Sequence, residues 1–180
     1  MTGHLMFSTL HTNTAIGAIP RLIDMGIEPF LLSSSLRSVV AQRLVRKICD
    51  SCKKEIEIPQ SVKERIEKIV KSIKSEELEK YGIDPNATFK FFHGTGCPSC
   101  NGTGLKGRLA IYEVVPLTDS IKYIITEKKG KEDLITKERD LMGLLTIKQD
   151  GILKILKGMT TIEEIERVTE GSITLLEEND

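Results

Sequence analysis

The chain of 180 residues is long enough for one good hydrophobic core, or for one core and a small module. Its 26 basic and 26 acidic side chains balance, so neither nucleic acid nor an anionic membrane surface is an expected partner. No apolar run approaches the roughly 20 residues that a membrane-spanning helix needs, and the absence of tryptophan disfavours base-stacking platforms. We therefore expect a soluble protein of a reducing cytoplasm, with no direct membrane insertion.

The first segment combines a β-prone run with a helix signal. Residues 5–10 predict a short strand, and Thr12 or Asn13 can cap a helix over residues 14–25. Pro20 lies inside that range and lacks a backbone donor. Either the helix is therefore kinked at this proline, or its first turns are a separate piece.

A second helix is predicted from Pro29, because proline suits the first helical position. Apolar side chains then recur at helical spacing as far as Val45. They are Phe30, Leu31, Leu32, Leu36, Val39, Val40, Leu44 and Val45. We expect this helix to deliver Cys49, the first cysteine of the chain.

The stretch between the second and third cysteines is predicted to fold into structure of its own. Residues 61–64 have the pattern of a capping box, and residues 62–73 place one apolar stripe on a helix otherwise covered with charge. A second short helix is expected over residues 75–82, and residues 90–93 should be extended. The charged helix faces are either simply solvated or bind a partner protein.

The C-terminal part is predicted to be one strand followed by helices. Residues 108–115 alternate enough for a strand, and Pro116 stops it before a helix capped at residues 118–119. Further helices are expected over residues 132–141, 147–156 and 162–169. A capping box at residues 161–164 opens the last of them, and the acidic tail over residues 173–180 should fray.

All four cysteines lie in two Cys-x-x-Cys pairs, Cys49 with Cys52 and Cys97 with Cys100. Two such pairs are the ligand set of a tetrahedral structural zinc, because two intervening residues let a tight turn aim both sulfurs at one ion. Glycines after the second pair suit the positive φ angles of a knuckle and expose N–H groups to sulfur. The pattern predicts one Zn²⁺ with four ligands and no open position, a site that staples the chain and performs no catalysis.

Two other uses of these cysteines are weaker. Disulfides would suit a secreted protein, but the sequence has no signal peptide and its cysteine density is too low for a disulfide scaffold. A redox pair would need to begin a helix in a βαβ unit, and neither pair is placed in this way. The gap over residues 53–96 exceeds the usual zinc-ribbon spacing of roughly 15 to 20 residues, so a folded segment must fill it.

The charge around the predicted site also suits a thiolate-bound metal. Four thiolates on one Zn²⁺ leave a net charge of roughly minus two, which nearby basic side chains can offset. They are Arg46, Lys47, Lys53, Lys54, Lys106 and Arg108. We expect metal removal to unfold residues 49–108 while leaving the C-terminal helices largely formed.

Two histidines, His4 and His11, flank the predicted strand over residues 5–10. His11 would lie at the carboxyl end of that strand, where α/β sheets present groups that contact ligands. Two isolated histidines in a small domain are, however, more often hydrogen-bonded packing residues than catalysts. Their chemistry alone leaves both uses open.

Short motifs follow one another in a specific order along nearly the whole chain, apart from the charged helices between the cysteine pairs. They occupy residues 2–13, 21–26, 28–30, 42–46, 49–52, 97–104, 107–108, 111–114, 143–151 and 158–164. The first, Thr2-Gly-His4-Leu-Met-Phe-Ser-Thr-Leu-His11-Thr-Asn13, resembles the His box of the type II secretion and type IV pilus assembly ATPases. The order of the motifs strengthens that resemblance more than any single motif does.

The resemblance implies an α/β fold, the C-terminal portion of a RecA-like P-loop ATPase domain, with a small tetracysteine zinc module and an α-helical C-terminal subdomain. Residues 1–48 would belong to the ATPase core, 49–108 to the zinc module, 109–172 to the last strand and helices, and 173–180 to a frayed tail. It also implies a homo-hexameric motor whose ATP-driven motions push pilin-like subunits out of the inner membrane through a membrane platform protein. Such a motor is cytoplasmic and peripheral to the inner membrane through its partners.

Site residues carry over from the same resemblance. In such motors the His box lies beside the nucleotide, so His11 would sense or contact the γ-phosphate side, with His4 as its neighbour near the catalytic carboxylate. A neutral imidazole can orient a water or donate to a phosphate oxygen without being the base. Arg43 and Arg46 match the Gln-Arg-Leu segment of the family and would bind phosphate or a neighbouring subunit, or else form surface salt bridges.

The sequence departs from the family in one respect that bears on activity. No Gly-x-x-x-x-Gly-Lys-[Ser/Thr] loop occurs between Met1 and Asp180, and ATP hydrolysis needs that phosphate cradle. We interpret the chain as the C-terminal part of a motor, with ATP and Mg²⁺ bound by the full-length parent, and expect no turnover by this part alone.

Two rival interpretations remain. The second cysteine pair and its glycines also resemble one repeat of the zinc region of J-domain co-chaperones, but that region uses several copies and this chain has one. Alternatively, the chain is a free-standing zinc-stapled interaction domain that docks on a secretion platform without nucleotide.

Overall fold

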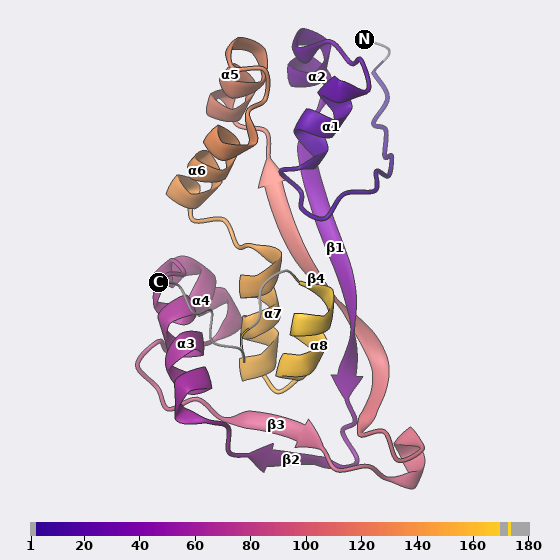
Figure 1. The fold of residues 1–180 in the computed structure, drawn as a ribbon, viewed down its shortest axis with the longest axis vertical. Coiled ribbons are helices and arrows are strands. Elements are labelled where there is room, and N and C mark those ends of the chain that lie inside the picture. Colours follow the sequence, from indigo (N-terminus) through magenta and orange to yellow (C-terminus); the bar gives the residue numbers. More distant parts are fainter. Residues whose placement is uncertain (1–2, 170–172, 174–180) are drawn as a thin grey trace. The chain divides into compact units, whose positions relative to one another are not determined.

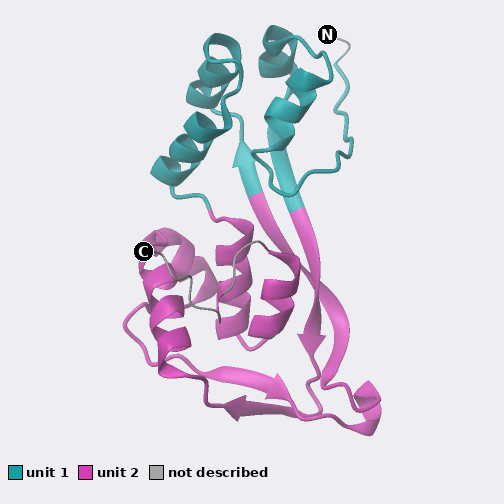
Figure 2. Ribbon diagram, in the orientation of Figure 1, with its two compact units in different colours: residues 1–41, 114–144 teal, residues 42–113, 145–180 magenta. Residues whose placement is uncertain are grey.

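The computed structural model describes residues 3–169 and residue 173. The chain divides into two compact units, which Figure 2 distinguishes by colour. The first unit contains residues 1–41 and 114–144, and the second contains residues 42–113 and 145–180. Each unit has a buried apolar cluster of its own. The functional modules predicted from the sequence follow other boundaries and stay a prediction.

The first unit is built from four helices around a small core (Figure 1). The helices are α1 (Ala18–Asp24), α2 (Pro29–Ser35), α5 (Asp119–Glu127) and α6 (Glu132–Met142). Helix α5 contacts both α2 and α6. The core side chains are Ala15, Ile16, Ile19, Leu32, Val115, Leu117, Ile121, Ile125 and Ile135. The cap predicted at residues 118–119 is confirmed, because the Thr118 side chain accepts from the backbone N–H of Ile121.

The helix predicted over residues 14–25 is shorter than expected. It begins at Ala18, so Pro20 lies in the first turn, where a backbone N–H has no acceptor within the helix. A separate turn precedes it, in which the N–H of Ala18 donates to the carbonyl of Ala15 at 3.2 Å. Of the two alternatives for Pro20, the one with a separate first piece is confirmed.

The strand predicted over residues 5–10 is wrong in this structure. These residues form neither helix nor strand, and Leu5, Met6 and Phe7 are exposed. A strand needs a neighbouring strand to satisfy its backbone groups, and the described residues provide none for this segment.

The helix predicted to run from Pro29 to Val45 is also wrong. Helix α2 ends at Ser35, and Leu36 is already extended, with φ −71° and ψ 134°. Strand β1 (Ser38–Ile48) follows and pairs with β4 (Leu105–Pro116). Its side chains alternate between more and less buried positions, and β-branched valines suit such a half-buried strand. A strand, therefore, leads the chain to Cys49.

The second unit combines a small sheet with four helices (Figure 1). Its further elements are β2 (Lys53–Ile56), α3 (Gln60–Lys71), α4 (Ser75–Tyr81), β3 (Phe91–Gly94), α7 (Ile147–Leu156) and α8 (Ile162–Val168). Strands β2 and β3 are antiparallel, with Lys53 opposite Gly94 and Ile56 opposite Phe91. Helix α7 contacts α3, α8 and β3. The predicted helices and strands of this region are confirmed, with shifts of a few residues at their ends.

Two capping predictions have different outcomes. The box at residues 61–64 is wrong, because α3 begins at Gln60 directly after Pro59 and no side chain caps it. The cap at Thr161 is confirmed, since its hydroxyl accepts from the N–H of Glu164 at 3.4 Å. The carboxylate of Glu164 does not complete a box but binds two arginines.

One core joins the elements of the second unit. It contains side chains from β1, α3, α4, β3, β4, α7 and α8. They are Val45, Val62, Ile66, Val70, Ile73, Leu78, Phe91, Ile111, Ile152, Leu153, Ile155, Ile162, Ile165 and Ile173. The segment between the cysteine pairs therefore shares a core with the C-terminal helices, which changes our expectation for metal removal.

Among the described residues, no helix is long and apolar enough to cross a membrane. Of the tail predicted over residues 173–180, the structure describes residue 173, and residues 174–180 lie outside the described part of the chain.

Candidate metal centre

The four cysteines lie in two turns at the ends of strands. Cys49 follows β1 and Cys52 precedes β2, whereas Cys97 precedes and Cys100 ends a short 3₁₀ turn between β3 and β4. Backbone hydrogen bonds join the two turns, because the N–H of Cys49 donates to the carbonyl of Gly104 at 2.9 Å. The main chain therefore holds the two Cys-x-x-Cys pairs against each other.

The sulfur atoms have the spacing of a tetrahedral thiolate site. The Sγ–Sγ distances are 3.8 Å for Cys49 and Cys97, 3.9 Å for Cys52 and Cys100, and 3.7 Å for Cys97 and Cys100. Four sulfurs placed about 2.3 Å from one central Zn²⁺ would be about 3.8 Å apart. All four cysteines are free, and these distances are far longer than the roughly 2.05 Å of a disulfide. The four cysteines can therefore bind one metal ion.

The environment of the thiols also favours a bound cation. Burial raises the pKa of the Cys100 thiol, but backbone N–H groups of Cys97 and Gly104, each 3.2 Å from its sulfur, help to lower it to about 6. Burial, together with hydrogen bonds from the neighbouring sulfurs, raises the pKa of Cys52 to about 12. Four thiols this close cannot all ionise unless a cation compensates their charge. A thiophilic metal ion provides that compensation.

Gly104 is the residue where the second turn crosses the end of β3. It has a φ of +73°, and a Cβ added there would overlap the carbonyl of Gly94. Its N–H donates to the sulfur of Cys100 and its carbonyl accepts from Cys49. One backbone position thus contacts a residue of each cysteine pair, and only glycine fits it.

We expect Gly104→Ala to destabilise the metal-loaded chain by at least about 2 kcal/mol, through both backbone strain and overlap with Gly94. The matched control is Gly102→Ala. Gly102 has a similar φ of +76°, but an added Cβ would have no atom within 4 Å, so only the strain of about 1 kcal/mol remains. Urea unfolding measures the free energy of unfolding of both variants. Equal losses of stability would contradict the importance of the close approach between Gly104 and Gly94.

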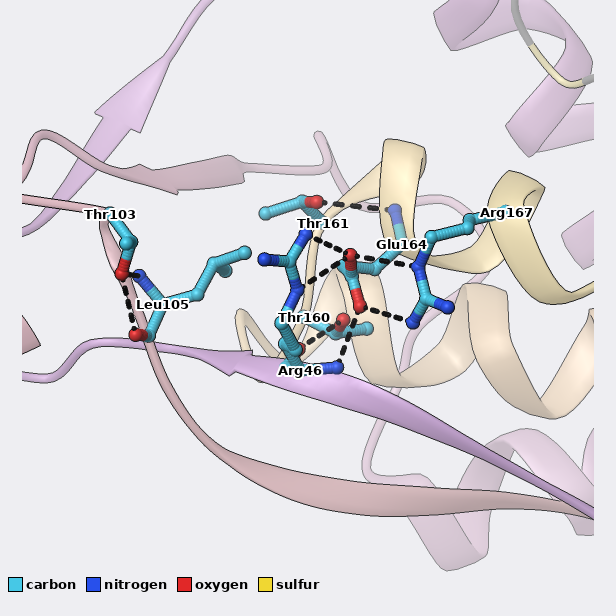
Figure 3. Close-up of polar contacts among 7 residues, drawn as sticks. All are labelled: Arg46, Thr103, Leu105, Thr160, Thr161, Glu164 and Arg167. Carbon is cyan, nitrogen blue, oxygen red and sulfur yellow. Dashed lines mark hydrogen bonds and ion pairs between the residues drawn. The ribbon is translucent and has the colours of Figure 1, made fainter.

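A buried carboxylate binds Arg46, which lies on β1 before Cys49 (Figure 3). Glu164 on α8 is only 3% exposed and accepts from Nη2 of Arg46 at 2.7 Å and from Nη2 of Arg167 at 2.8 Å. Burial raises the pKa of this carboxyl, but hydrogen bonds from Arg167 and Arg46 outweigh burial and lower it to about 2. The carboxylate is therefore ionised at physiological pH.

Sequence reasoning missed this role of Glu164. The sequence places Glu164 in a capping box and in the last of the family motifs, and its partner Arg46 lies 118 positions earlier in the chain. For Arg46 the sequence predicts contact with phosphate or a neighbouring subunit, or else a surface salt bridge. In the structure its guanidinium pairs with Glu164 while its side chain remains 53% exposed.

The remaining predicted site residues lie elsewhere. His4 and His11 are both exposed, in the segment before α1. They belong to the first unit, whereas the cysteines and both arginines belong to the second. Arg43 is half-buried on β1. The nucleotide roles of these residues stay predictions.

A second buried carboxylate, Asp150 on α7, was also missed. It accepts from the backbone N–H of Tyr112 at 2.7 Å, from Nζ of Lys154 at 2.5 Å and from the hydroxyl of Tyr81. Burial and the adjacent carboxylate both raise the pKa of Tyr81 well above its usual value. Because Tyr81 ends α4, this cluster attaches the segment between the cysteine pairs to α7 and β4.

Comparison with known proteins places this arrangement in a family. Residues 1–167 match the family described as Type II/IV secretion system protein. The chain belongs to this family. The resemblance predicted from the order of the motifs is thereby confirmed, and the match includes both cysteine pairs.

Named members of the type II/IV secretion family are similar over nearly the whole chain. Type II secretion system protein E of Pseudomonas aeruginosa is 42% identical over 169 residues, which are 94% of this chain and 30% of that protein. The type IV pilus assembly ATPase PilB of Myxococcus xanthus is 38% identical over 167 residues, which are 92% of this chain and 27% of that protein. The chain therefore spans less than a third of the length of these relatives.

The fold of this family member also resembles a solved motor structure. The pilus retraction motor PilT with bound ADP matches with a TM-score of 0.54, covering 97% of this chain and 35% of that chain. The sequence identity is 22%, so this likeness concerns the fold alone. The predicted α/β fold is confirmed, since the likeness and the family match support part of a RecA-like secretion ATPase domain, and the four cysteines lie close together.

Proposed function

We propose that the chain is the C-terminal part of a hexameric ATPase motor that powers type II protein secretion or type IV pilus assembly. The observation that carries this proposal is the family match over residues 1–167, combined with coverage of only 30% and 27% of two relatives. One of these relatives is named a pilus assembly ATPase, and the other a type II secretion system protein. The chain would thus contribute one part of each motor subunit.

In this function the cysteine cluster binds Zn²⁺ as a structural staple. Four thiolates leave no open position for substrate or for a catalytic water. The tetrahedral sulfur spacing and the N–H groups that face Cys100 support this assignment. The ion would fix the turns that connect β1 to β2 and β3 to β4.

Nucleotide chemistry belongs to the full-length subunit, which would bind ATP and Mg²⁺ through segments that this sequence does not contain. His11 would contact the γ-phosphate side of the nucleotide, with His4 beside it. Arg43 and Arg46 would contact phosphate or a neighbouring subunit. The ion pair with Glu164 supports a defined orientation of the Arg46 guanidinium while half of its side chain remains accessible.

The partners follow from the same assignment. The chain would assemble as part of a homo-hexamer and act on a platform protein of the inner membrane from the cytoplasmic side. The balanced charge of 26 basic and 26 acidic residues gives no support for nucleic acid as a partner. A free-standing zinc-stapled adaptor is the second candidate, favoured by the fact that the chain supplies all four cysteines and a core for each unit.

We expect the purified 180-residue chain to show no ATP turnover above the buffer rate, because it has no phosphate-binding loop. A phosphate-release assay over a range of protein concentrations measures this. Turnover that scales with concentration and disappears in His11→Ala would contradict the prediction.

A second measurement separates motor from adaptor. An antibody against the cysteine module should detect a species far heavier than 20.1 kDa in the native cells if the chain is part of a motor subunit. A species of 20.1 kDa alone would overturn the motor proposal in favour of the adaptor.

A further inference from the structure

We propose that Glu164 is a positioning residue for the metal centre, which holds the end of β1 so that Cys49 is presented to the ion. The inference rests on the proposed metal site. Glu164 contacts none of the cysteines in the described hydrogen bonds, so its effect is transmitted through the residues that precede Cys49.

The first step of this connection is the contact between Glu164 and Arg46 (Figure 3). The carboxylate accepts from the backbone N–H of Arg46 at 2.8 Å and also from its Nε at 3.0 Å and Nη2 at 2.7 Å. Arg167 binds the same carboxylate, and its Nη2 donates to Glu164 at 2.8 Å. One buried carboxylate thus fixes both the main chain and the side chain of Arg46.

The second step is the turn between α7 and α8, which lies along the same stretch of β1. The hydroxyl of Thr160 donates to the carbonyl of Arg46 at 2.8 Å. The N–H of Ile48 donates to the carbonyl of Met159 at 3.0 Å. Backbone groups of Arg46 and Ile48, at the end of β1 before Cys49, are therefore hydrogen-bonded to this turn.

The third step reaches the metal ligands. Cys49 follows Ile48 directly, and its N–H donates to the carbonyl of Gly104, whose own N–H faces the sulfur of Cys100. A continuous path of hydrogen bonds and consecutive residues thus joins Glu164 to both cysteine pairs. Loss of a group that hydrogen-bonds directly to a metal ligand typically weakens metal binding by roughly 10- to 100-fold. Glu164 acts on Cys49 through Arg46, so we expect an effect at the low end of that range.

The consequence concerns how the ion leaves. Release requires a ligand to move away from the metal, and proteins open locally where few bonds must break. For Cys49 to move, the bonds of Arg46 and Ile48 to α8 and its preceding turn must open with it. Glu164 therefore slows release of the ion. Because opening of α8 weakens binding of the ion, the bound ion in turn makes that opening less favourable.

The experiment uses Co²⁺ as the probe, because its thiolate complexes absorb visible light. The Co²⁺-loaded 180-residue chain is mixed with excess chelator, and the decay of absorbance gives the release rate. We expect Glu164→Gln to release Co²⁺ about tenfold faster than the wild type. Glu163→Gln, the same change at the exposed neighbouring residue, should remain within about twofold.

Two further variants separate positioning from general loss of stability. Asp150→Asn removes a buried carboxylate of the same unit that does not contact residues 46–49 in the described hydrogen bonds. It should destabilise the fold without accelerating release by more than about twofold. If Glu164→Gln does not fold, Thr160→Val should release Co²⁺ faster than Thr160→Ser, which keeps the hydroxyl that bonds Arg46.

The possible outcomes are distinguishable. The inference is supported if Glu164→Gln releases Co²⁺ faster than wild type while Glu163→Gln and Asp150→Asn do not, and if Glu164→Gln also loses the metal-dependent hydrogen-exchange protection of α8. Release from Glu164→Gln that is no faster than release from Asp150→Asn, whether both rates are fast or both equal the wild-type rate, overturns it and leaves the metal site standing. A wild-type chain that binds no Co²⁺ overturns the metal site and the inference together.

Discussion

Cys49→Ser is expected to abolish tight metal binding and to unfold the second unit at 37 °C. Structural Zn²⁺ sites contribute apparent binding free energies of about 10 kcal/mol or more, which is comparable to the whole stability of a typical domain. Serine cannot replace a thiolate, so most of this contribution is lost. We expect the same result when a chelator removes the ion from the wild-type chain.

The unfolding should extend beyond the cysteine module. Val45 before the first pair, Phe91 before the second and Ile111 after it share one core with Ile152 and Ile165 of the C-terminal helices. Loss of the turns therefore removes packing from α7 and α8 as well. The structure thus replaces the expectation that these helices would remain formed.

Hydrogen exchange followed by mass spectrometry measures the extent of this unfolding. Protection should be lost over β2, β3, α7 and α8, while the helices of the first unit, which have their own core, keep theirs. Ser51→Ala, an exposed change between two ligands, is the matched control and should behave as wild type. Protection retained in α7 and α8 after verified metal removal would contradict the shared core.

Asp150→Asn is expected to destabilise the metal-loaded second unit by about 4 kcal/mol, because it removes one partner of a buried ion pair. Nζ of Lys154 lies 2.5 Å from Asp150, in a side chain only 12% exposed. The oxygen of the asparagine amide can still accept from the N–H of Tyr112, and its NH2 group can donate to the hydroxyl of Tyr81. The positive charge of Lys154, however, is left without its buried counter-charge.

Urea unfolding of the Zn²⁺-loaded chain, followed by tyrosine fluorescence, measures this loss. A Tyr123→Phe background leaves only the two tyrosines of the second unit, Tyr81 and Tyr112. Asp140→Asn, which alters a carboxylate that is 60% exposed, is the control and should change stability by less than about 0.5 kcal/mol. A loss below about 1 kcal/mol in Asp150→Asn would show that the cluster contributes little.

The features that the sequence predicted correctly depend on neighbouring residues. The Cys-x-x-Cys spacing alone indicated a shared site for Cys49, Cys52, Cys97 and Cys100, and the four sulfurs do come together. Gly82, with a φ of 60°, ends α4 as expected, because glycine tolerates the left-handed region. Short-range spacing and backbone preference are sufficient for such predictions.

Secondary-structure predictions failed where the spacing of apolar residues was compatible with both a helix and a strand. The apolar residues between Pro29 and Val45 fit a helix, but residues 38–48 form a strand because β4 lies beside them. Residues 5–10 have the composition of a strand and lack a neighbour among the described residues. Whether such a segment forms a strand depends on a partner elsewhere in the chain.

By itself the sequence determined the family, the grouping of the four cysteines and most of the helices, because motif order, cysteine spacing and helix caps depend on consecutive residues. Only the tertiary structure decided that β1 is a strand and that one core unites the cysteine module with α7 and α8. It also decided the partners of Glu164 and Asp150, since Arg46 and Tyr81 are 118 and 69 positions away from them. Contacts over such separations depend on how whole elements pack, and no local pattern encodes them.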